Sequence, residues 1–214
     1  MNKITLTIIL ICILMACKNK QNKAPQDEKK QTLNTIDETL ITDSTWGLIN
    51  ATTQFADLKK LLDSTQLKDE RICGPECIDS IDVTKIYYDT KNEAIIYWQD
   101  SAYHKKIAFI TAYKEASDWH TSDGLKIGSP LIALLRLNGK AITFSGFGWD
   151  YGGAISSYQG GKLETSPIEF GLDKPYNEKD TSTALLGDQV LNTDSPFVKK
   201  ELPSIIIRRI SLSL

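Results

Sequence analysis

The chain has 214 residues, of which 41% are hydrophobic and 24% are charged, and its formal net charge at pH 7 is −2. A nucleic-acid partner normally requires a clustered basic face, so this charge balance predicts no nucleic acid partner. The composition is that of a globular protein. The roughly 170 residues that follow the N-terminal segments described next fit a single domain, expected over residues 41–214.

Residues 1–16 have the pattern of a signal peptide. Lys3 supplies a positive charge, and residues 4–14 are mostly apolar but too few for a typical membrane-spanning helix. The segment leads into Leu14-Met15-Ala16-Cys17, which resembles the lipobox of bacterial lipoproteins. The resemblance implies that Cys17 becomes the first residue of the mature chain and carries lipid such as palmitate. The alternative is an ordinary secretory signal that is cleaved nearby, with Cys17 incidental.

Residues 17–40 are predicted to be a flexible tether. They are rich in Lys, Gln, Asn and Glu and have few large apolar residues, so they cannot bury enough surface to offset the entropy lost on ordering. Their lysines offer an alternative role as contacts to an anionic membrane surface. By resemblance to lipoprotein sorting in Gram-negative bacteria, Lys18 and Asn19 after the cysteine favour the outer membrane over the inner one.

The densest structural signals lie in residues 121–162. Ser129 and Pro130 suit the N-cap and the first position of a helix, and Gly139 suits its left-handed C-terminal end. An apolar stripe between them is expected to pack on strands, because so short a helix is unstable alone in water. The stripe consists of Leu131, Leu134, Leu135 and Asn138.

The first half of the chain weakly repeats this pattern. A Gly-Leu turn, a hydroxyl residue and an apolar helical pattern follow one another twice, which predicts a second short helix after Thr52. The five similar pairs are Gly47 with Gly124, Leu48 with Leu125, Ala51 with Gly128, Thr52 with Ser129, and Leu58 with Leu135.

Several segments have the β-branched and aromatic content of strands. A hairpin turn is expected at residues 89–92, and residues 165–200, with Pro167, Pro175 and Pro196, are expected to be mostly loop. The predicted strands are residues 83–88, 94–98, 107–113, 154–158, 162–164 and 205–214, together with one that ends at residues 146–153. Short turns between consecutive strands favour an antiparallel sheet, so the predicted fold class is α+β with two short helices.

A family resemblance rests on the same central stretch. The runs Asp123-Gly124-Leu125-Lys126-Ile127-Gly128, Leu137-Asn138-Gly139-Lys140 and Gly146-Phe147-Gly148-Trp149-Asp150-Tyr151-Gly152-Gly153 are similar to a pattern shared by a group of uncharacterised Gram-negative envelope lipoproteins. Ile142 stands where that group usually has phenylalanine. The resemblance implies no activity. At the level of fold, the order of helix and strands is also similar to small envelope domains of the β-lactamase-inhibitor-protein-like and BamE-like kinds.

Cys73 and Cys77 are predicted to form a disulfide. An exported chain meets an oxidising compartment, and Gly74 and Pro75 favour the tight turn that so small a loop needs. The alternative is a redox site, because the sequence resembles the Cys-Gly-Pro-Cys of thioredoxins. However, it has one residue too many and no strand-then-helix context.

Trp149, Asp150 and Tyr151 are the candidate binding residues. Their flanking glycines allow close approach of other groups to the backbone, and exposed Trp and Tyr side chains stack on sugars or dominate protein interfaces. Asp150 would then hydrogen-bond a ligand. The alternative is that both aromatic rings fill the core under the helices and that Asp150 caps a turn.

The sequence offers no catalytic set, no metal site and no cofactor fingerprint. His104 and His120 have no partner at metal-ligand spacing, and no nucleophile elbow, phosphate loop or dinucleotide motif occurs. A carboxylate pair such as Asp123 and Asp150 would suit a hydrolase, but nothing singles it out.

We therefore expect a non-enzymatic binding module in the cell envelope. Its partners would be the membrane, through the Cys17 lipid, and another envelope protein or a glycan. The alternative function is a carbohydrate-binding or carbohydrate-active protein that uses Trp149, Asp150 and Tyr151.

Overall fold

The protein was analysed as a computed structural model, which describes residues 36–214 except 75–76, 101 and 179–181. Residues 36–214 form one compact unit. The expected signal peptide, Cys17 and most of the expected tether lie outside the described residues. The fold includes Leu40, which pairs with His120, so ordered structure begins slightly before the expected residue 41.

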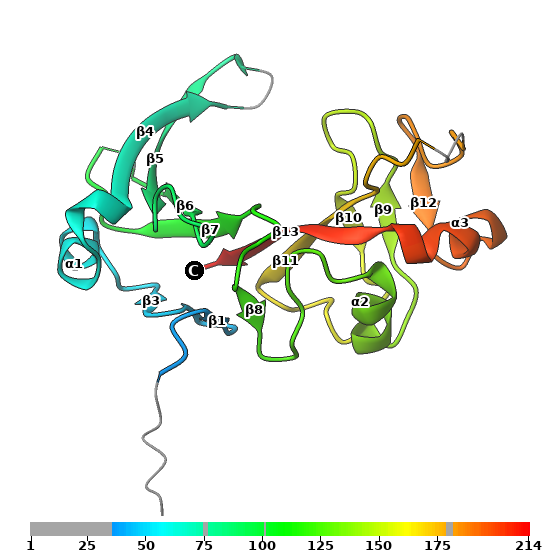
Figure 1. Ribbon diagram of the computed structural model, residues 1–214, viewed down its shortest axis with the longest axis horizontal. Helices are drawn as coiled ribbons and strands as arrows, with labels where there is room; N and C mark the ends of the chain where they lie inside the picture. The colour runs from blue at the N-terminus through cyan, green and yellow to red at the C-terminus, as the bar shows by residue number, and fades with distance from the viewer. Residues whose placement is uncertain (1–35, 75–76, 101, 179–181) are drawn as a thin grey trace, which may run out of the picture. The chain divides into compact units, whose positions relative to one another are not determined.

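A six-stranded antiparallel sheet dominates the fold and confirms the α+β class (Figure 1). Its strands lie in the order β11-β13-β7-β6-β5-β4. The C-terminal strand β13 therefore lies inside the sheet, between two strands that are far apart in the sequence. The bounds are β4 (Leu67–Cys73), β5 (Ser80–Ile86), β6 (Ala94–Trp98), β7 (Ile107–Ala112), β11 (Ile168–Asp173) and β13 (Ile206–Ser213).

Two smaller sheets and the helices complete the fold. The first has the order β3-β2-β1-β8, with β1 and β8 parallel, and the second has the order β10-β9-β12. The first comprises β1 (Leu40–Ile41), β2 (Thr45–Trp46), β3 (Ile49–Asn50) and β8 (His120–Thr121), and the second β9 (Thr143–Ser145), β10 (Ile155–Ser157) and β12 (Val190–Asn192). The helices are α1 (Phe55–Leu61), α2 (Leu131–Asn138) and α3 (Pro196–Glu201), with 3-10 turns η1 (Ser64–Gln66) and η3 (Leu202–Ser204).

The main core covers one face of the large sheet. Directly paired residues of neighbouring strands share a face, so Ile96 and Ile110 point to the same side as Leu212. All three are fully buried, together with Ile41 and Trp46 of the small N-terminal sheet. Trp46 packs on Trp119 with ring centroids 5.1 Å apart.

The opposite face carries more polar and aromatic side chains. We call it the open face, because α1, α2 and the N-terminal sheet lie below or beside the large sheet in Figure 1. By strand pairing it includes Glu70, Val83, Lys85, Ile95, Tyr97, Phe109, Thr111, Arg209 and Ser211.

The C-terminal end of α2 was predicted correctly and the N-terminal end was not. Gly139 closes the helix in the left-handed conformation, with φ 74°, as expected. Ser129 is not the N-cap: that position is Pro130, and the first helical N–H, of Leu131, donates to the Ile205 carbonyl at 2.8 Å. The chain leading into β13 thus replaces the expected hydroxyl cap. Thr52 does not cap α1 either, whose N-cap is Gln54.

The strand predictions hold where the apolar pattern is strong. Those at residues 94–98, 107–113 and 205–214 are confirmed by β6, β7 and β13. The strand expected at residues 162–164 is a turn. The interpretation of residues 165–200 as mostly loop missed β11, β12 and α3, because short strands and a six-residue helix carry little periodicity between prolines and turns.

Asn138 is buried at the end of α2 and links three segments. Its side-chain amide donates to the carbonyls of Lys140 (3.0 Å) and Tyr158 (2.9 Å). Its oxygen accepts the Leu163 N–H at 3.1 Å. The position expected in an apolar stripe therefore holds the turn after β10 against the helix.

Asn138→Ala should destabilise the protein by about 3 kcal/mol, because three backbone groups lose their partners in a buried site. Chemical denaturation of the variant beside the wild type measures this loss. Asn192→Ala is the matched control: its side chain accepts a single exposed hydrogen bond, from Asp194 N–H. Equal losses in the two variants would contradict the role assigned to Asn138.

Candidate functional site

The loop of residues 146–153 is held against the edge of the large sheet. The Gly153 carbonyl accepts the Leu172 N–H of β11 at 2.9 Å, and Ala154 forms a bridge to Gly171. Gly153 has φ 73°, and a Cβ there would collide with the Leu172 carbonyl. Phe147 is buried and packs near Phe144, with ring centroids 5.7 Å apart. The glycines and Phe147 thus fix the loop.

Trp149 and Tyr151 lie at the surface, with 36% and 58% of their residue areas exposed. The alternative that both rings fill the core is wrong. They occupy a turn and meet edge to face, with centroids 5.5 Å apart. The Trp149 indole N–H donates to the Gly146 carbonyl at 2.8 Å, so it is already used inside the loop.

A cavity of about 200 Å³ lies between this loop and the ends of three strands. Asp150 and Tyr151 line it from the loop, and Tyr113 lines it from the end of β7. Arg208 and Arg209 line it from β13, at a point where the pairing with β11 shifts at a β-bulge. Bulges of this kind redirect side chains and are frequent beside functional sites.

Arg209 is the unusual member of this cavity. Its Nε is buried and has no hydrogen-bond partner among the described residues. By contrast, Arg208 pairs with Glu115 at 3.1 Å and donates to the Tyr113 carbonyl. The Arg209 side chain passes over Gly171, where a Cβ would lie 3.2 Å from Arg209 Nε. A larger residue at position 171 would therefore crowd the guanidinium.

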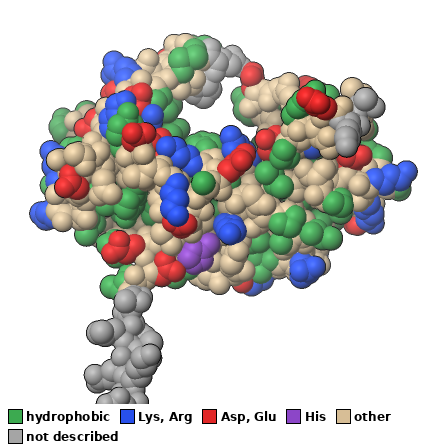
Figure 2. All heavy atoms as spheres, in the orientation of Figure 1, with side chains coloured by type: hydrophobic (Ala, Val, Ile, Leu, Met, Phe, Trp, Pro, Cys, Tyr) green, Lys and Arg blue, Asp and Glu red, His purple; other side chains and the backbone are tan. Residues whose placement is uncertain are grey.

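Aromatic rings continue from this cavity across the open face. Tyr113 neighbours Tyr97, and Tyr97 stacks on Phe109 with centroids 4.2 Å apart at 15°. Both stacked rings are half-buried. Figure 2 shows the surface hollowed between the hairpin of β4 and β5 and the part of the molecule that carries β9, β10 and β12. On the hairpin side, the Glu70 carboxylate contacts the Lys85 ammonium.

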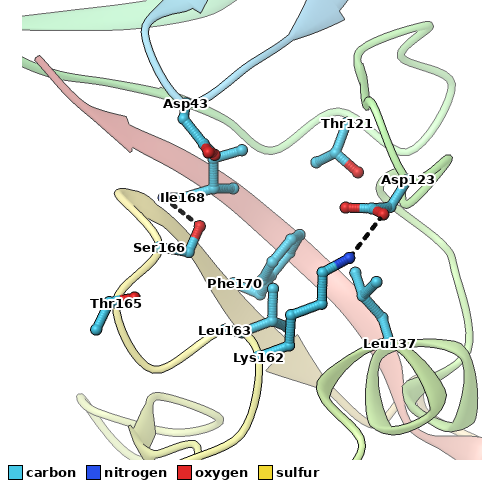
Figure 3. A pocket seen from close by; sticks show the side chains of 10 residues that line it. All are labelled: Asp43, Thr121, Asp123, Leu137, Lys162, Leu163, Thr165, Ser166, Ile168 and Phe170. Carbon is cyan, nitrogen blue, oxygen red and sulfur yellow. Dashed lines mark hydrogen bonds and ion pairs between the residues drawn. The ribbon is translucent and has the colours of Figure 1, made fainter.

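A second cavity, of about 160 Å³, lies near α2 (Figure 3). Lys162 points across it and pairs with Asp123 at 3.2 Å. The cation in this cavity is therefore already neutralised. Asp123 and Asp150 line different cavities, so the structure does not bring the possible hydrolase pair together.

The histidines have structural contacts. His104 stacks on Trp98, with centroids 5.0 Å apart, and His120 Nε2 lies 3.4 Å from the Asp37 carboxylate. Among the residues that the structure describes, no three His, Cys, Asp or Glu side chains are grouped to hold a metal. Within the same residues, no helix is long and apolar enough to cross a membrane.

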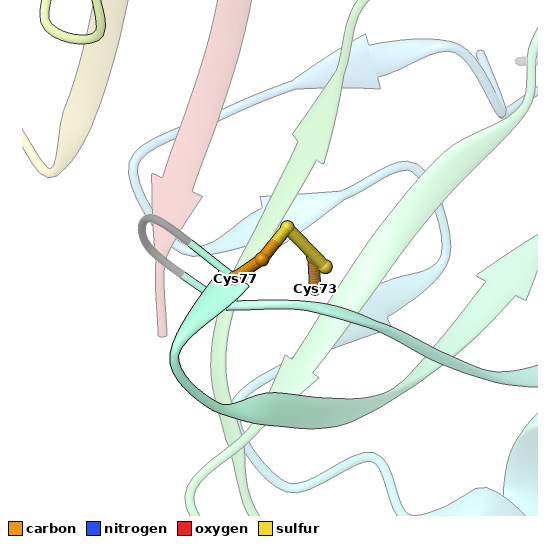
Figure 4. The surroundings of a disulfide bond; sticks show 2 residues. All are labelled: Cys73 and Cys77. Carbon is orange, nitrogen blue, oxygen red and sulfur yellow. A yellow bond between two sulfur atoms is a disulfide. The ribbon is translucent and has the colours of Figure 1, made fainter.

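The predicted disulfide between Cys73 and Cys77 is present (Figure 4). Cys73 is the last residue of β4, and Gly74 N–H donates to the Asp79 carbonyl at 2.7 Å. The bond therefore closes the tip of the hairpin of β4 and β5. The strand β5, rather than an α-helix, follows the Cys73–Cys77 turn, which differs from the thioredoxin arrangement.

Sequence reasoning missed Tyr97, Tyr113 and Arg209 as site residues. A signal was available in β13, where Arg208 and Arg209 interrupt a run of isoleucines. One of two consecutive residues in a regular strand faces the core, so paired charges there indicate a bulge or a polar face.

Burial perturbs two phenols near Arg209. It raises the pKa of Tyr97 to about 12, and the neighbouring Tyr113 adds to the shift. Burial likewise raises the pKa of Tyr158 to about 12. Proximity to the positive Arg209 opposes both shifts but does not overcome burial. Both phenols are therefore neutral at physiological pH.

No protein-family model and no curated protein matches this chain. Among solved structures, the crystal structure of the uncharacterized protein yfeY from Escherichia coli is similar, with a TM-score of 0.45 and 14% sequence identity. The match covers 82% of this chain and 100% of that chain. At this similarity it carries no argument about the site.

Trp149→Ala should cost about 1 kcal/mol of stability, because the ring is partly exposed and loses one hydrogen bond. Trp119→Ala, which empties a buried ring position, should cost about 3–5 kcal/mol. Denaturant unfolding of the two variants compares them. A loss for Trp149→Ala as large as that for Trp119→Ala would assign the ring to the folding core.

The two shifted phenols predict an alkaline loss of stability. Their folded pKa values lie above the ordinary value of 10.0, so the neutral forms stabilise the fold fully below about pH 10, and this contribution is lost as the pH rises through about 12. Phenolate absorbance should show a late titration step that Tyr97→Phe and Tyr158→Phe each reduce. In denaturant the late step should vanish. Burial also raises the pKa of Tyr87, so a smaller late step can remain in a Tyr97→Phe, Tyr158→Phe double variant. Persistence of the late step in denaturant, or at undiminished size in the double variant, would contradict the assignment.

Proposed function

We propose that this protein is a non-enzymatic binding module of the cell envelope, tethered by lipid on Cys17 at the outer membrane. Its binding surface is the open face of the large sheet together with the 146–153 loop at the margin. The observation that carries the proposal is the half-buried stack of Tyr97 and Phe109 beside exposed Tyr151, which leaves aromatic surface available to a ligand or partner.

Three features support a binding role for this surface. Aromatic side chains dominate binding energy when a partner desolvates them. The glycines of the 146–153 loop hold Tyr151 beside Arg209, so part of the surface is preorganised and would cost little entropy on binding. The Cys73–Cys77 bond closes the far end of the hairpin that borders the hollow.

The alternative is carbohydrate binding at Trp149, Asp150 and Tyr151. Its support is the exposed pair of rings beside an exposed carboxylate. The edge-to-face geometry leaves parts of both rings open for stacking on a sugar. However, the indole N–H is committed to Gly146, so the hydrogen bonds to a glycan would come from Asp150 and the Tyr151 hydroxyl.

Site-directed photo-crosslinking in the envelope tests the proposal. A photoreactive phenylalanine placed at Phe109 and, separately, at Tyr151 should capture the same envelope component. The matched control is Phe197 on α3, which is also exposed but lies outside the open face. Equal capture at all three positions, or none at Phe109 and Tyr151, would remove the open face as the binding surface. A Cys17→Ser variant should leave the membrane fraction.

Titration with glycans tests the alternative, carbohydrate binding at the 146–153 loop. Soluble envelope glycans should quench tryptophan fluorescence if they stack on Trp149, and Trp149→Phe should remove that change. Saturable quenching that survives in Trp149→Phe would place the glycan elsewhere. The absence of quenching would contradict carbohydrate binding at Trp149.

A further inference from the structure

The cavity beside the 146–153 loop contains donors without acceptors. The Arg209 guanidinium has five N–H donors, and its buried Nε–H has no acceptor among the described residues. Arg71 in the same sheet shows the ordinary arrangement, with Nε 2.8 Å from an Asp82 carboxylate oxygen. A buried donor without a partner is costly. Because this Nε is itself buried, a ligand in the cavity would bind the terminal N–H groups of the guanidinium and add the missing negative charge beside it.

The charges around the cavity favour an anion. Arg208 is already paired with Glu115, whereas Arg209 has no carboxylate partner among the residues that the structure describes. Asp150 also lines the cavity but makes no ion pair with Arg209. Tyr113 and Tyr151 line the cavity with aromatic rings and hydroxyls, and Tyr97 lies next to Tyr113. A planar guanidinium presents two parallel donors, which fits the two oxygens of a carboxylate or a phosphate.

The size of the cavity and its surroundings limit the rest of the ligand. A volume of about 200 Å³ suits a small group rather than a whole ligand of ordinary size. The Tyr97 and Phe109 rings extend from the cavity across the open face through Tyr113. An apolar or aromatic body attached to the anionic group would lie on these rings.

We propose that Arg209 is the recognition residue for an oxyanion, carboxylate or phosphate, that is carried on an apolar or aromatic body. The oxyanion enters the cavity between the 146–153 loop and β13, and the body lies over Tyr113 and Tyr97. This inference rests on the proposed binding function and names the chemistry of its ligand.

Small-molecule titration of the purified protein tests this assignment. The probes are phenyl phosphate, benzoate, inorganic phosphate and uncharged benzamide, and the readout is the chemical shift of the Arg209 Nε–H group. Phenyl phosphate and benzoate should bind saturably and shift this signal, whereas benzamide should not. Inorganic phosphate binding as tightly as phenyl phosphate would show a site for a free anion and remove the apolar body from the proposal.

Two arginine variants provide the matched comparison. Arg209→Gln should weaken binding of phenyl phosphate and benzoate by about tenfold or more, since it removes charge-assisted hydrogen bonds. Arg136→Gln should leave binding within about threefold, because Arg136 is exposed on α2 and does not line the cavity. Asp150→Asn should tighten binding, since it removes a negative charge from the cavity. Equal affinities in wild type and Arg209→Gln would overturn the assignment.

Thermal unfolding distinguishes a loss of probe binding from a loss of fold stability in Arg209→Gln. Arg209→Gln without probe should unfold at the wild-type temperature or higher, because the side chain it removes has no partner in the fold. Saturating phenyl phosphate should raise the unfolding temperature of the wild type but not of Arg209→Gln. A variant that is much less stable without probe would show that Arg209 supports the fold.

The outcomes for this inference and for the proposed function are separable. Specific crosslinking at Phe109 and Tyr151 without any probe binding would keep the binding surface and discard the oxyanion. Probe binding that depends on Arg209 without specific crosslinking would keep the site and discard the larger binding surface.

Discussion

The pairing of strand β13 with its two neighbours is the interaction on which the rest of the fold depends. It pairs with β7 on one side and β11 on the other, so the last residues of the chain join two halves of the sheet that are otherwise separate. Its leading residues also bind the start of α2, where Gly128 N–H donates to the Ile207 carbonyl at 2.8 Å. These contacts link distant parts of the chain, so loop-closure entropy opposes them until the sheet is largely formed.

The position of β13 also creates the candidate site. A bulge opposite β11 brings Arg208 and Arg209 to the same cavity, where Arg208 pairs with Glu115 and Arg209 passes over Gly171. The same edge of the sheet receives the 146–153 loop through Gly153 and Leu172. The cavity therefore forms only when the C-terminal strand, the edge strand and the loop have come together.

The sequence predicts the parts of this fold that repeat a local pattern. β6 and β13 follow from runs of β-branched residues, and Gly139 marks the end of α2. The site could not be predicted in the same way, because Arg209 reaches Tyr97 and Tyr113 only through the pairing of β13 with β7, two strands that are far apart in the sequence. Asn138 shows the same limit: it fits an apolar stripe by spacing, yet its partners lie in turns that spacing does not reveal.

The 146–153 loop meets two requirements, and different residues meet each of them. Gly153 must lack a side chain to approach the Leu172 carbonyl, and Phe147 must be buried, so these positions serve the fold. Trp149 and Tyr151 leave apolar surface exposed. This exposed surface does not stabilise the fold and is typical of interaction surfaces. The loop is thus rigid where it meets the sheet and aromatic where it meets solvent. A fixed backbone that presents exposed rings beside an unpaired guanidinium reduces the entropy lost on binding, and this is the physical reason to look for the function there.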